Sequence, residues 1–201
     1  MLLFYNQIYS YLAMTTLFLP EDLASPHTFC PYGANGGESL SFSAWAVWVR
    51  SVADGKNIDA RLQMLVASTM GATAFQKGLG AMHALAHPLG ALFDAHHGLL
   101  NAILMPYVLS ANRSAIEARI NRVSAYIGLA EPNFAGFISW ILDLRSRLAI
   151  PHSLAEIEID RQLADRVAQM ASEDPSAGGN PIAFSTGQYR QIFQRAVAGD
   201  L

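Results

Sequence analysis

The chain has 201 residues, of which 52% are hydrophobic and 14% are charged, and its formal net charge is −3. This balance excludes a disordered chain, which has few apolar residues and much charge. Lys and Arg are scattered singly rather than clustered, so the sequence predicts no nucleic-acid partner. The single cysteine, Cys30, excludes an internal disulfide and favours a reducing, cytoplasmic setting.

Residues 1–19 carry no charged side chain and are mostly apolar, which is a pattern shared by buried helices, membrane spans and signal peptides. No Lys or Arg precedes Arg50, so the basic region of a signal peptide is missing. Polar side chains such as Asn6 and Gln7 also interrupt the run. We therefore predict a buried helix and no membrane partner. A small membrane-associated protein remains the alternative.

Residues 21–38 form the clearest break in the chain, because proline and glycine are too dense there for a helix or strand. We predict two parts: residues 1–38, an apolar helix and a loop, and residues 39–201, a helical domain. Gly33 to Gly37 is a weak candidate for a phosphate-binding loop. No strand-like run precedes it and no Lys-Ser/Thr follows it, so we interpret it as an ordinary loop.

Apolar residues recur at helical spacing through the rest of the chain, and no segment alternates like a strand. The candidate helix caps are Asp59, Ser114, Asn133 and either Ser185 or Thr186. Pro106 is a candidate kink. The sequence thus predicts an all-α helical bundle, with helices over 40–52, from 59 onward, 79–93, 97–111, 116–127, 137–148, 160–170 and 186–199, and a loop over 174–181.

Three histidines stand out in this pattern. His83 and His87 are four residues apart and project from one face of a predicted helix that is otherwise apolar. A break follows before His97, so the chain can fold back and bring His97 against His83. Neutral imidazole is a common metal ligand, but a metal site usually has three or four ligands. The spacing alone leaves a metal site and ordinary core histidines both open.

The longer pattern around these histidines is more specific. Gly80-Ala-Met-His83-Ala-Leu-Ala-His87-Pro-Leu-Gly90, then Ala95-His-His97-Gly98 and Asn101-Ala-Ile-Leu-Met-Pro106, closely resembles the signature of iron-containing (group III) alcohol dehydrogenases. Similar flanking segments extend the resemblance over residues 41–201. It implies the C-terminal, helical, metal-binding domain of that family.

The resemblance also implies roles for individual residues. His83 and His97 would be metal ligands, and His87 would be a catalytic residue beside the metal and the nicotinamide ring, assisting proton relay. His96 would be a neighbour of the site and Phe75 part of its wall. The metal would be Fe²⁺, with Zn²⁺ as the alternative, and would polarise the oxygen of a small alcohol or aldehyde. Hydride would pass to or from NAD(P).

Two features of the family are not matched. Its N-terminal nucleotide-binding domain has no counterpart in these residues, and neither has the Asp and His pair that supplies the other two ligands. Aligning Ile8 to Tyr11 with the family places Leu2 and Asn6 at those ligand positions, and neither is a suitable donor. Other donors are Glu21, Asp22, His27, Cys30 and Asp94. With two histidines only, we expect weak or absent metal binding.

We therefore hold two main hypotheses. The first is the metal-binding half of an NAD(P)-dependent alcohol dehydrogenase. The second is a non-catalytic relic or helical interaction module. The family's helical domain covers a cleft shared with the nucleotide domain, so without that partner an apolar face would be exposed. We accordingly expect homo-oligomers or association with a nucleotide-binding domain.

Overall fold

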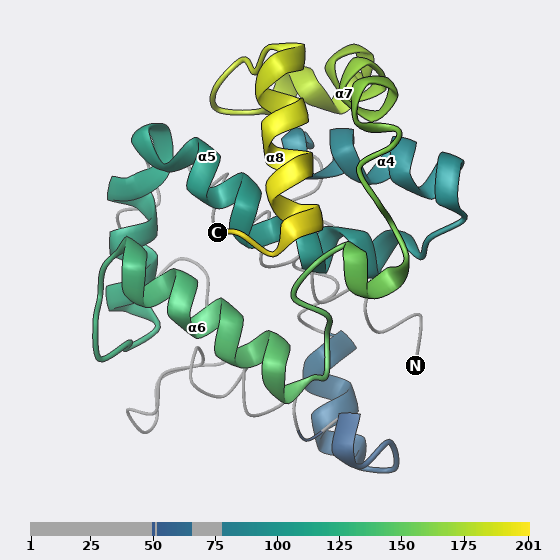
Figure 1. Cartoon of the computed structure of the whole chain (residues 1–201). Helices are drawn as coiled ribbons and strands as arrows, with labels where there is room; N and C mark the ends of the chain where they lie inside the picture. The colour runs from purple at the N-terminus through teal and green to yellow at the C-terminus, as the bar shows by residue number, and fades with distance from the viewer. Residues whose placement is uncertain (1–49, 51, 66–77) are drawn as a thin grey trace.

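The computed structural model describes residues 50, 52–65 and 78–201. Within these ranges the regular structure is helical and contains no strand, which confirms the all-α prediction (Figure 1). The elements are α4 (Ala81–Phe93), α5 (His97–Tyr126), α6 (Phe134–Arg147), the 3₁₀ turn η1 (Ala155–Ile157), α7 (Ala164–Glu173), the 3₁₀ turn η2 (Pro175–Gly179) and α8 (Thr186–Ala198).

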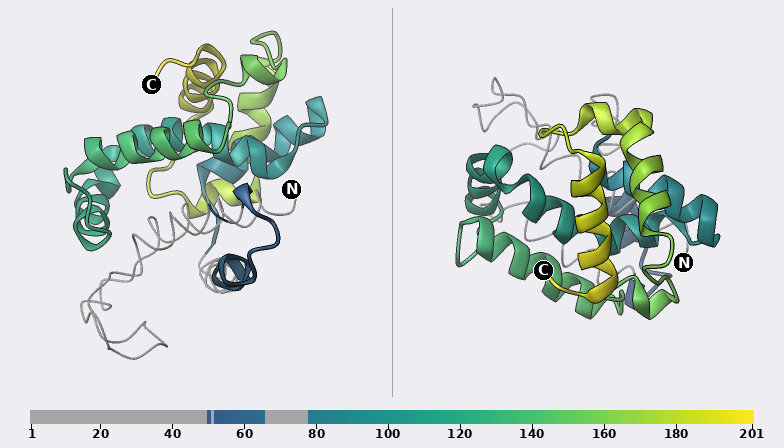
Figure 2. Two further views of the ribbon diagram at one scale, coloured as in Figure 1. Left: turned by 90° about the horizontal axis from the view of Figure 1, so that it is seen from below. Right: turned by 45° about the horizontal axis from the view of Figure 1, so that its top comes forward.

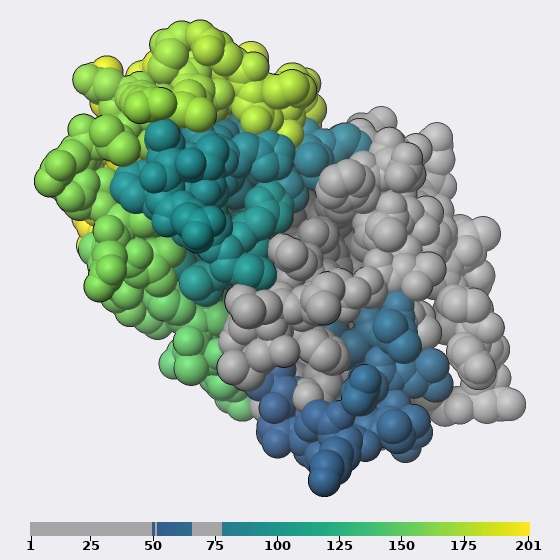
Figure 3. Space-filling model, turned by 90° about the vertical axis from the view of Figure 1, so that its right-hand side faces the viewer, coloured from purple at the N-terminus to yellow at the C-terminus, as the bar shows by residue number. Residues whose placement is uncertain are grey.

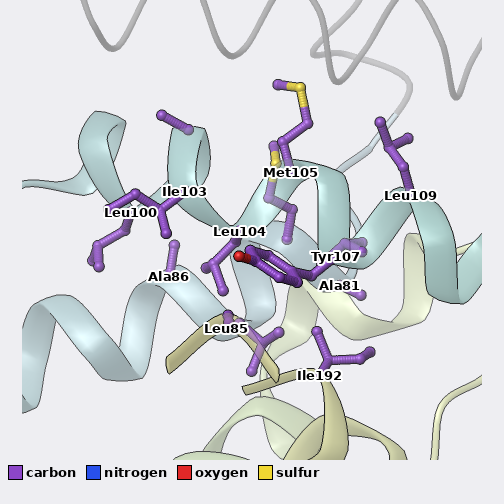
Figure 4. Packing of buried hydrophobic residues seen from close by; sticks show 14 of the residues in the cluster. Ala81, Leu85, Ala86, Leu100, Ile103, Leu104, Met105, Tyr107, Leu109 and Ile192 are labelled. Carbon is purple, nitrogen blue, oxygen red and sulfur yellow. The ribbon is translucent and has the colours of Figure 1, made fainter. Parts of the chain in front are cut away.

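Helix α4 is the central element, because it contacts α5, α7, η2 and α8. Most of its residues are buried, in keeping with its apolar, alanine-rich sequence. Its side chains fill the space between α5 and α8: Leu85 lies between Leu104 of α5 and Ile192 of α8 (Figure 4). Any residue on the inner face of α4 is therefore held by neighbours on several sides.

The remaining helices extend this core in two directions. Helix α6 packs on α5, and α7 packs on both α8 and α4 (Figure 2). In the space-filling view, α4 and the beginning of α5, in blue and teal, lie beside the green-to-yellow C-terminal residues (Figure 3). The surface around α4 and the beginning of α5 is thus formed by segments that are distant in the sequence.

Two polar side chains fix the connection after α6. Arg145 is only 1% exposed, and its guanidinium donates to the carbonyl oxygens of Pro151, at 2.7 Å, and Ile103, at 3.4 Å. The Tyr107 hydroxyl donates to the His152 carbonyl at 2.7 Å. These bonds offset the cost of burying polar groups and attach residues 151–152 to α5.

The start of α4 is clamped by the chain that follows η2. The Asn180 side chain accepts a hydrogen bond from the Ala81 amide at 3.1 Å. It also exchanges two hydrogen bonds with the side chain of Asn112 on α5, at 2.8 and 3.0 Å. The backbones approach so closely that a Cβ at Gly179 would lie 2.0 Å from the Leu79 carbonyl oxygen, so only glycine fits.

Some predicted boundaries were wrong. The separate helices expected over 97–111 and 116–127 are one 30-residue helix, α5, and Ser114 lies inside it. Its buried face runs on through Asn112 to Ile116, so tertiary packing outweighs the polar stretch that favoured a cap. Residues 174–181 contain η2 rather than only loop, and α7 begins at Ala164, later than expected.

Two of the predicted helix caps are confirmed, and a third was assigned to the wrong residue. Asn133 and Ser185 accept hydrogen bonds from the first turns of α6 and α8, as predicted. Helical residues 58–65 are capped by Asn57, which accepts from the Ala60 amide at 3.0 Å, rather than by Asp59. Asn57 is at the right distance to accept a first-turn N–H, whereas Asp59 already lies in the helix.

Several predictions lie outside the described residues. They concern the apolar segment 1–19, the proline- and glycine-rich loop with Gly33 to Gly37, most of the helix over 40–52, and the part of the next helix beyond residue 65. Within the part of the chain that the structure describes, no helix is long and apolar enough to cross a membrane.

The clamp at Asn180 leads to a prediction about stability. Replacing Asn180 with Ala removes the acceptor for Ala81 and leaves buried Asn112 without its partner, so we expect a loss of about 2–4 kcal/mol in the free energy of unfolding. Urea denaturation measures this loss. As control, Asn133→Ala removes a single exposed cap and should cost about 1 kcal/mol. Equal costs for the two variants would contradict the clamp.

Candidate functional site

Three histidine rings meet where α4 and α5 join. His83 and His87 lie one turn apart on α4, and His97 is the first residue of α5. The ring centroids of His83 and His97 are 5.3 Å apart, those of His87 and His97 are 5.4 Å apart and stacked, and those of His83 and His87 are 6.0 Å apart. The predicted approach of His97 to His83 is therefore present in the fold.

A short turn brings the rings together. α4 ends at Phe93 and is followed by Asp94, whose φ of 52° is the left-handed conformation common just after helices. His96 then caps α5, with its Nδ1 accepting a hydrogen bond from the Leu99 amide at 3.3 Å. One nitrogen of the His96 ring is thus used as a cap, and this ring lies near enough to His97 to help lower its pKa.

The Nε2 atoms of two histidines converge on one amide. Asn101 lies one turn after His97 on α5 and is only 1% exposed. Its Nδ2 lies 3.0 Å from His97 Nε2 and 3.4 Å from His83 Nε2. An amide nitrogen only donates, so both Nε2 atoms act as acceptors and both rings carry their proton on Nδ1. The Asn101 Oδ1 is buried and has no hydrogen-bond partner among the described residues.

His87 is held by a different group. Its Nδ1 lies 2.8 Å from Oδ2 of Asp174, the residue between α7 and η2. The His87 side chain is 42% exposed, whereas that of Asp174 is 13% exposed. The other Asp174 oxygen accepts from the Ser176 amide at 2.8 Å, which fixes the carboxylate. His87 thus has one nitrogen anchored and lies at the accessible side of the cluster.

Burial and mutual repulsion keep the inner rings neutral. Burial, followed by the nearby His97 and His87, lowers the pKa of His83 to about 4. Burial, followed by His87 and His96, also lowers the pKa of His97. Burial would raise the pKa of Asp174, but hydrogen bonds from His87 and Ser176 outweigh it and bring that pKa below its ordinary value. At neutral pH His83 and His97 are therefore neutral, and the anchored Asp174 carboxylate is ionised.

Asp94, the one other candidate donor within the described residues, does not join this cluster. Asp94 is exposed at the end of α4. Across residues 50, 52–65 and 78–201, no group of three His, Cys, Asp or Glu side chains is arranged to hold a metal ion. The other candidate donors, Glu21, Asp22, His27 and Cys30, lie outside the described residues, as do the aligned positions Leu2 and Asn6 and the expected wall residue Phe75.

Two residues of the cluster were not predicted as site residues. Asn101 is four residues after His97, a spacing that places both on one helix face, so this signal was present in the sequence. Asp174 is 87 residues from His87, and no sequence spacing connects them. Only the packing of α7 and η2 on α4 makes that contact.

Comparisons with known proteins agree with this architecture. Residues 46–197 match the model of the Fe-containing alcohol dehydrogenase family, C-terminal. The chain is 36% identical over 162 residues to a 4-hydroxybutyrate dehydrogenase of Cupriavidus necator, covering 76% of this chain and 42% of that protein. It is 32% identical over 154 residues to a 1,3-propanediol dehydrogenase of Citrobacter freundii, covering 73% and 40%.

Solved structures show the same likeness. The chain superposes on an alcohol dehydrogenase from Oenococcus oeni with a TM-score of 0.72 and 27% identity, covering 96% of this chain and 49% of that one. For a 1,3-propanediol oxidoreductase the TM-score is 0.69 and the identity 29%, covering 81% and 46%. The chain thus spans about two-fifths of the length of these curated relatives. Since the family model matches most of the chain, this protein belongs to the Fe-containing alcohol dehydrogenase family, of which it carries the C-terminal domain.

Proposed function

We propose that this chain is the metal-binding half of an alcohol dehydrogenase that interconverts a small alcohol and its aldehyde with NAD(P). The observation that carries the proposal is the convergence of His83 Nε2 and His97 Nε2 on one buried point between α4 and α5. Family membership supports it, because it supplies the reaction class in which such a pair of histidines has a use.

The donor chemistry of the pair fits Fe²⁺ or Zn²⁺. Imidazole binds these ions only when the coordinating nitrogen is unprotonated, and both Nε2 atoms are already acceptors. The lowered pKa values of both rings preserve that state at neutral pH. His83 and His97 would hold the ion, which would act as a Lewis acid on the oxygen of the alcohol or aldehyde.

His87 is the proposed proton-transferring residue. With Nδ1 donating to Asp174, its Nε2 is left as an acceptor on a side chain that is 42% exposed. That nitrogen can receive the hydroxyl proton of an alcohol and pass it towards solvent. The His97 ring is stacked on the His87 ring, with centroids 5.4 Å apart, and this contact keeps His87 next to the proposed metal ligands. Asp174 orients the ring, as a carboxylate partner does for catalytic histidines.

The substrate and the redox partner follow from the relatives. Those described above are named for 4-hydroxybutyrate and 1,3-propanediol, and we propose a small alcohol or aldehyde for this chain as well. Others are named NADPH-dependent butanol dehydrogenase and NAD-dependent methanol dehydrogenase, which supports NAD(P) as the hydride carrier. A cytoplasmic setting, where reduced nicotinamides circulate, is part of the same proposal.

A nucleotide-binding domain or a second copy of the chain is the proposed partner. Ile58, Leu62 and Leu65 recur at helical spacing and are 71%, 56% and 60% exposed. Exposed apolar side chains on one helix face favour association with another protein surface. This supports the expectation of an oligomer or of docking to a nucleotide-binding domain.

A non-catalytic helical module is the second candidate. The observation in its favour is that the described residues assemble no group of three His, Cys, Asp or Glu side chains around a common point. A chain that folds but binds neither metal nor nucleotide would fit this alternative.

The metal ligands are tested by alanine substitution. We expect His83→Ala and His97→Ala each to reduce Zn²⁺ affinity at least about tenfold, because each removes one donor from a site that has few. Isothermal titration of the purified full chain measures this affinity. His152→Ala is the matched control, since it removes an exposed histidine on a distant loop and should leave the affinity unchanged. Equal affinity in all variants would refute the assignment.

The neutral state of His83 predicts a pH dependence of stability. Because the folded-state pKa of about 4 lies below the ordinary 6.5, the unfolded chain binds the proton first as the pH falls. The contribution is therefore fully present above pH 6.5 and is lost as the pH falls towards 4, amounting to about 3 kcal/mol over that range. Urea denaturation in the presence of a chelator measures it. In His83→Gln the loss should be smaller, and an unchanged dependence would contradict the prediction.

The orienting role of Asp174 predicts a change in the tautomer of His87. In the parent chain we expect the Nδ1–H tautomer, because Nδ1 donates to the carboxylate. In Asp174→Asn the carboxylate is replaced by a neutral amide of the same shape, so the Nδ1–H population should fall. Long-range ¹H–¹⁵N spectra at pH 8 report the protonated nitrogen directly. Asp165→Asn, which changes an exposed carboxylate paired with Arg190, should leave the His87 signals as in the parent.

A further inference from the structure

The helical residues 58–65 have two apolar faces. One face packs into the core through Ala60 and Met64, which are 4% and 2% exposed. The other face carries three large apolar side chains at intervals of four and three residues, here called the apolar stripe: Ile58, Leu62 and Leu65. These three are 71%, 56% and 60% exposed. A helix with a second apolar face fits one contact within its own chain and another with a separate surface.

Exposed apolar side chains are concentrated around this helix. Six large hydrophobic side chains are exposed in the part of the chain that the structure describes, and four of them, including Val52, belong to residues 52–65. In the space-filling view these residues, in dark blue, lie at the lower edge of the molecule, apart from α4 and the beginning of α5 (Figure 3). A domain that delivers NAD(P) has to reach the histidine site, so a stripe apart from that site fits a different partner.

Two opposite charges border the apolar stripe. Because successive residues of an α-helix are turned by about 100°, Asp59 lies on one side of the stripe and Arg61 on the other. The Arg61 Nη1 donates to the Gly55 carbonyl at 3.0 Å, which draws the guanidinium back towards the start of the helix, where Asp59 lies. Within the described part of the chain neither charge forms an ion pair, so both are available to a partner.

The placement of these charges suits a second copy of the chain in one orientation. When two identical helices pack face to face and run parallel about a two-fold axis, each flank of one helix meets the opposite flank of the other. Asp59 of each copy then lies beside Arg61 of the second copy. In an antiparallel pair like flanks meet, so Arg61 would face Arg61 of the second copy. Attraction between unlike charges favours the parallel pair, and repulsion between like charges disfavours the antiparallel one.

We propose that the apolar stripe is the interface of a homodimer, in which the helices of two copies run parallel, with the stripe at the centre and two Asp59–Arg61 pairs at the edges. The inference rests on the proposed function only in choosing between its two partners, since no residue of the histidine site takes part. Residues 58–65 span about 12 Å, so they cover less than the roughly 800 Å² that each partner of a stable interface buries. The dimer is therefore weak and reversible.

The test is sedimentation equilibrium of the full chain over a wide range of concentrations, with a chelator present so that metal ions cannot bridge two copies. The parent should dimerise reversibly. Asp59→Arg and Arg61→Asp should each weaken dimerisation at least about tenfold, because each replaces two attractive pairs with two repulsive ones. An equal mixture of these two variants should regain the parent affinity, since the pairs between unlike chains again have opposite charges. The double variant should also dimerise as the parent does.

The centre of the interface is tested by Leu62→Gln, which should weaken dimerisation at least about tenfold because it removes apolar area from both copies. Tyr126→Gln is the matched control, since it changes a side chain that is 67% exposed on α5, and it should dimerise as the parent does. Circular dichroism checks the folding of each variant. A parent that stays monomeric at every concentration overturns the homodimer, and a mixture that stays monomeric while the parent dimerises overturns the parallel pairing. Neither result affects the histidine site, which the Zn²⁺ titration tests separately.

Discussion

The pairing of the buried amide of Asn112 on α5 with the half-buried amide of Asn180 after η2 is the constraint on which the rest of the site depends. Asn180 also receives the first amide of α4, so one side chain joins three segments that are far apart in sequence. Buried amides tolerate few alternative arrangements, because each lost hydrogen bond leaves a costly polar group. The pair therefore fixes where α4 begins and, two residues later, where His83 lies.

The same clamp explains how the outer part of the site is built. η2 and the residue before it are held against α4 by the close contact of Gly179 with Leu79. Asp174, at the other end of η2, thereby reaches His87. The inner histidines are set by the α4–α5 turn, whereas the third histidine is oriented by the C-terminal region. A buried, neutral pair and an accessible, carboxylate-anchored ring thus arise from one packing arrangement.

Asn101 links this architecture to its proposed chemistry. The proposed metal ligands of the resemblance, His83 and His97, lie together, but the described residues arrange no group of three His, Cys, Asp or Glu side chains that could hold a metal ion. The buried amide of Asn101 lies within hydrogen-bond distance of both rings. A carboxylate would not satisfy two acceptor nitrogens.

The sequence by itself determined the all-α class, the caps at Asn133 and Ser185, the family and the His83, His87 and His97 cluster, because these rest on local periodicity, capping chemistry and a contiguous motif. It did not determine the single long α5, since a polar stretch resembles a helix cap unless its buried face is known. Nor did it determine the partner of His87 or the clamp at Asn180. Those contacts join residues 68 to 99 positions apart, and only the packing of α7, η2 and α5 around α4 brings them within hydrogen-bond distance.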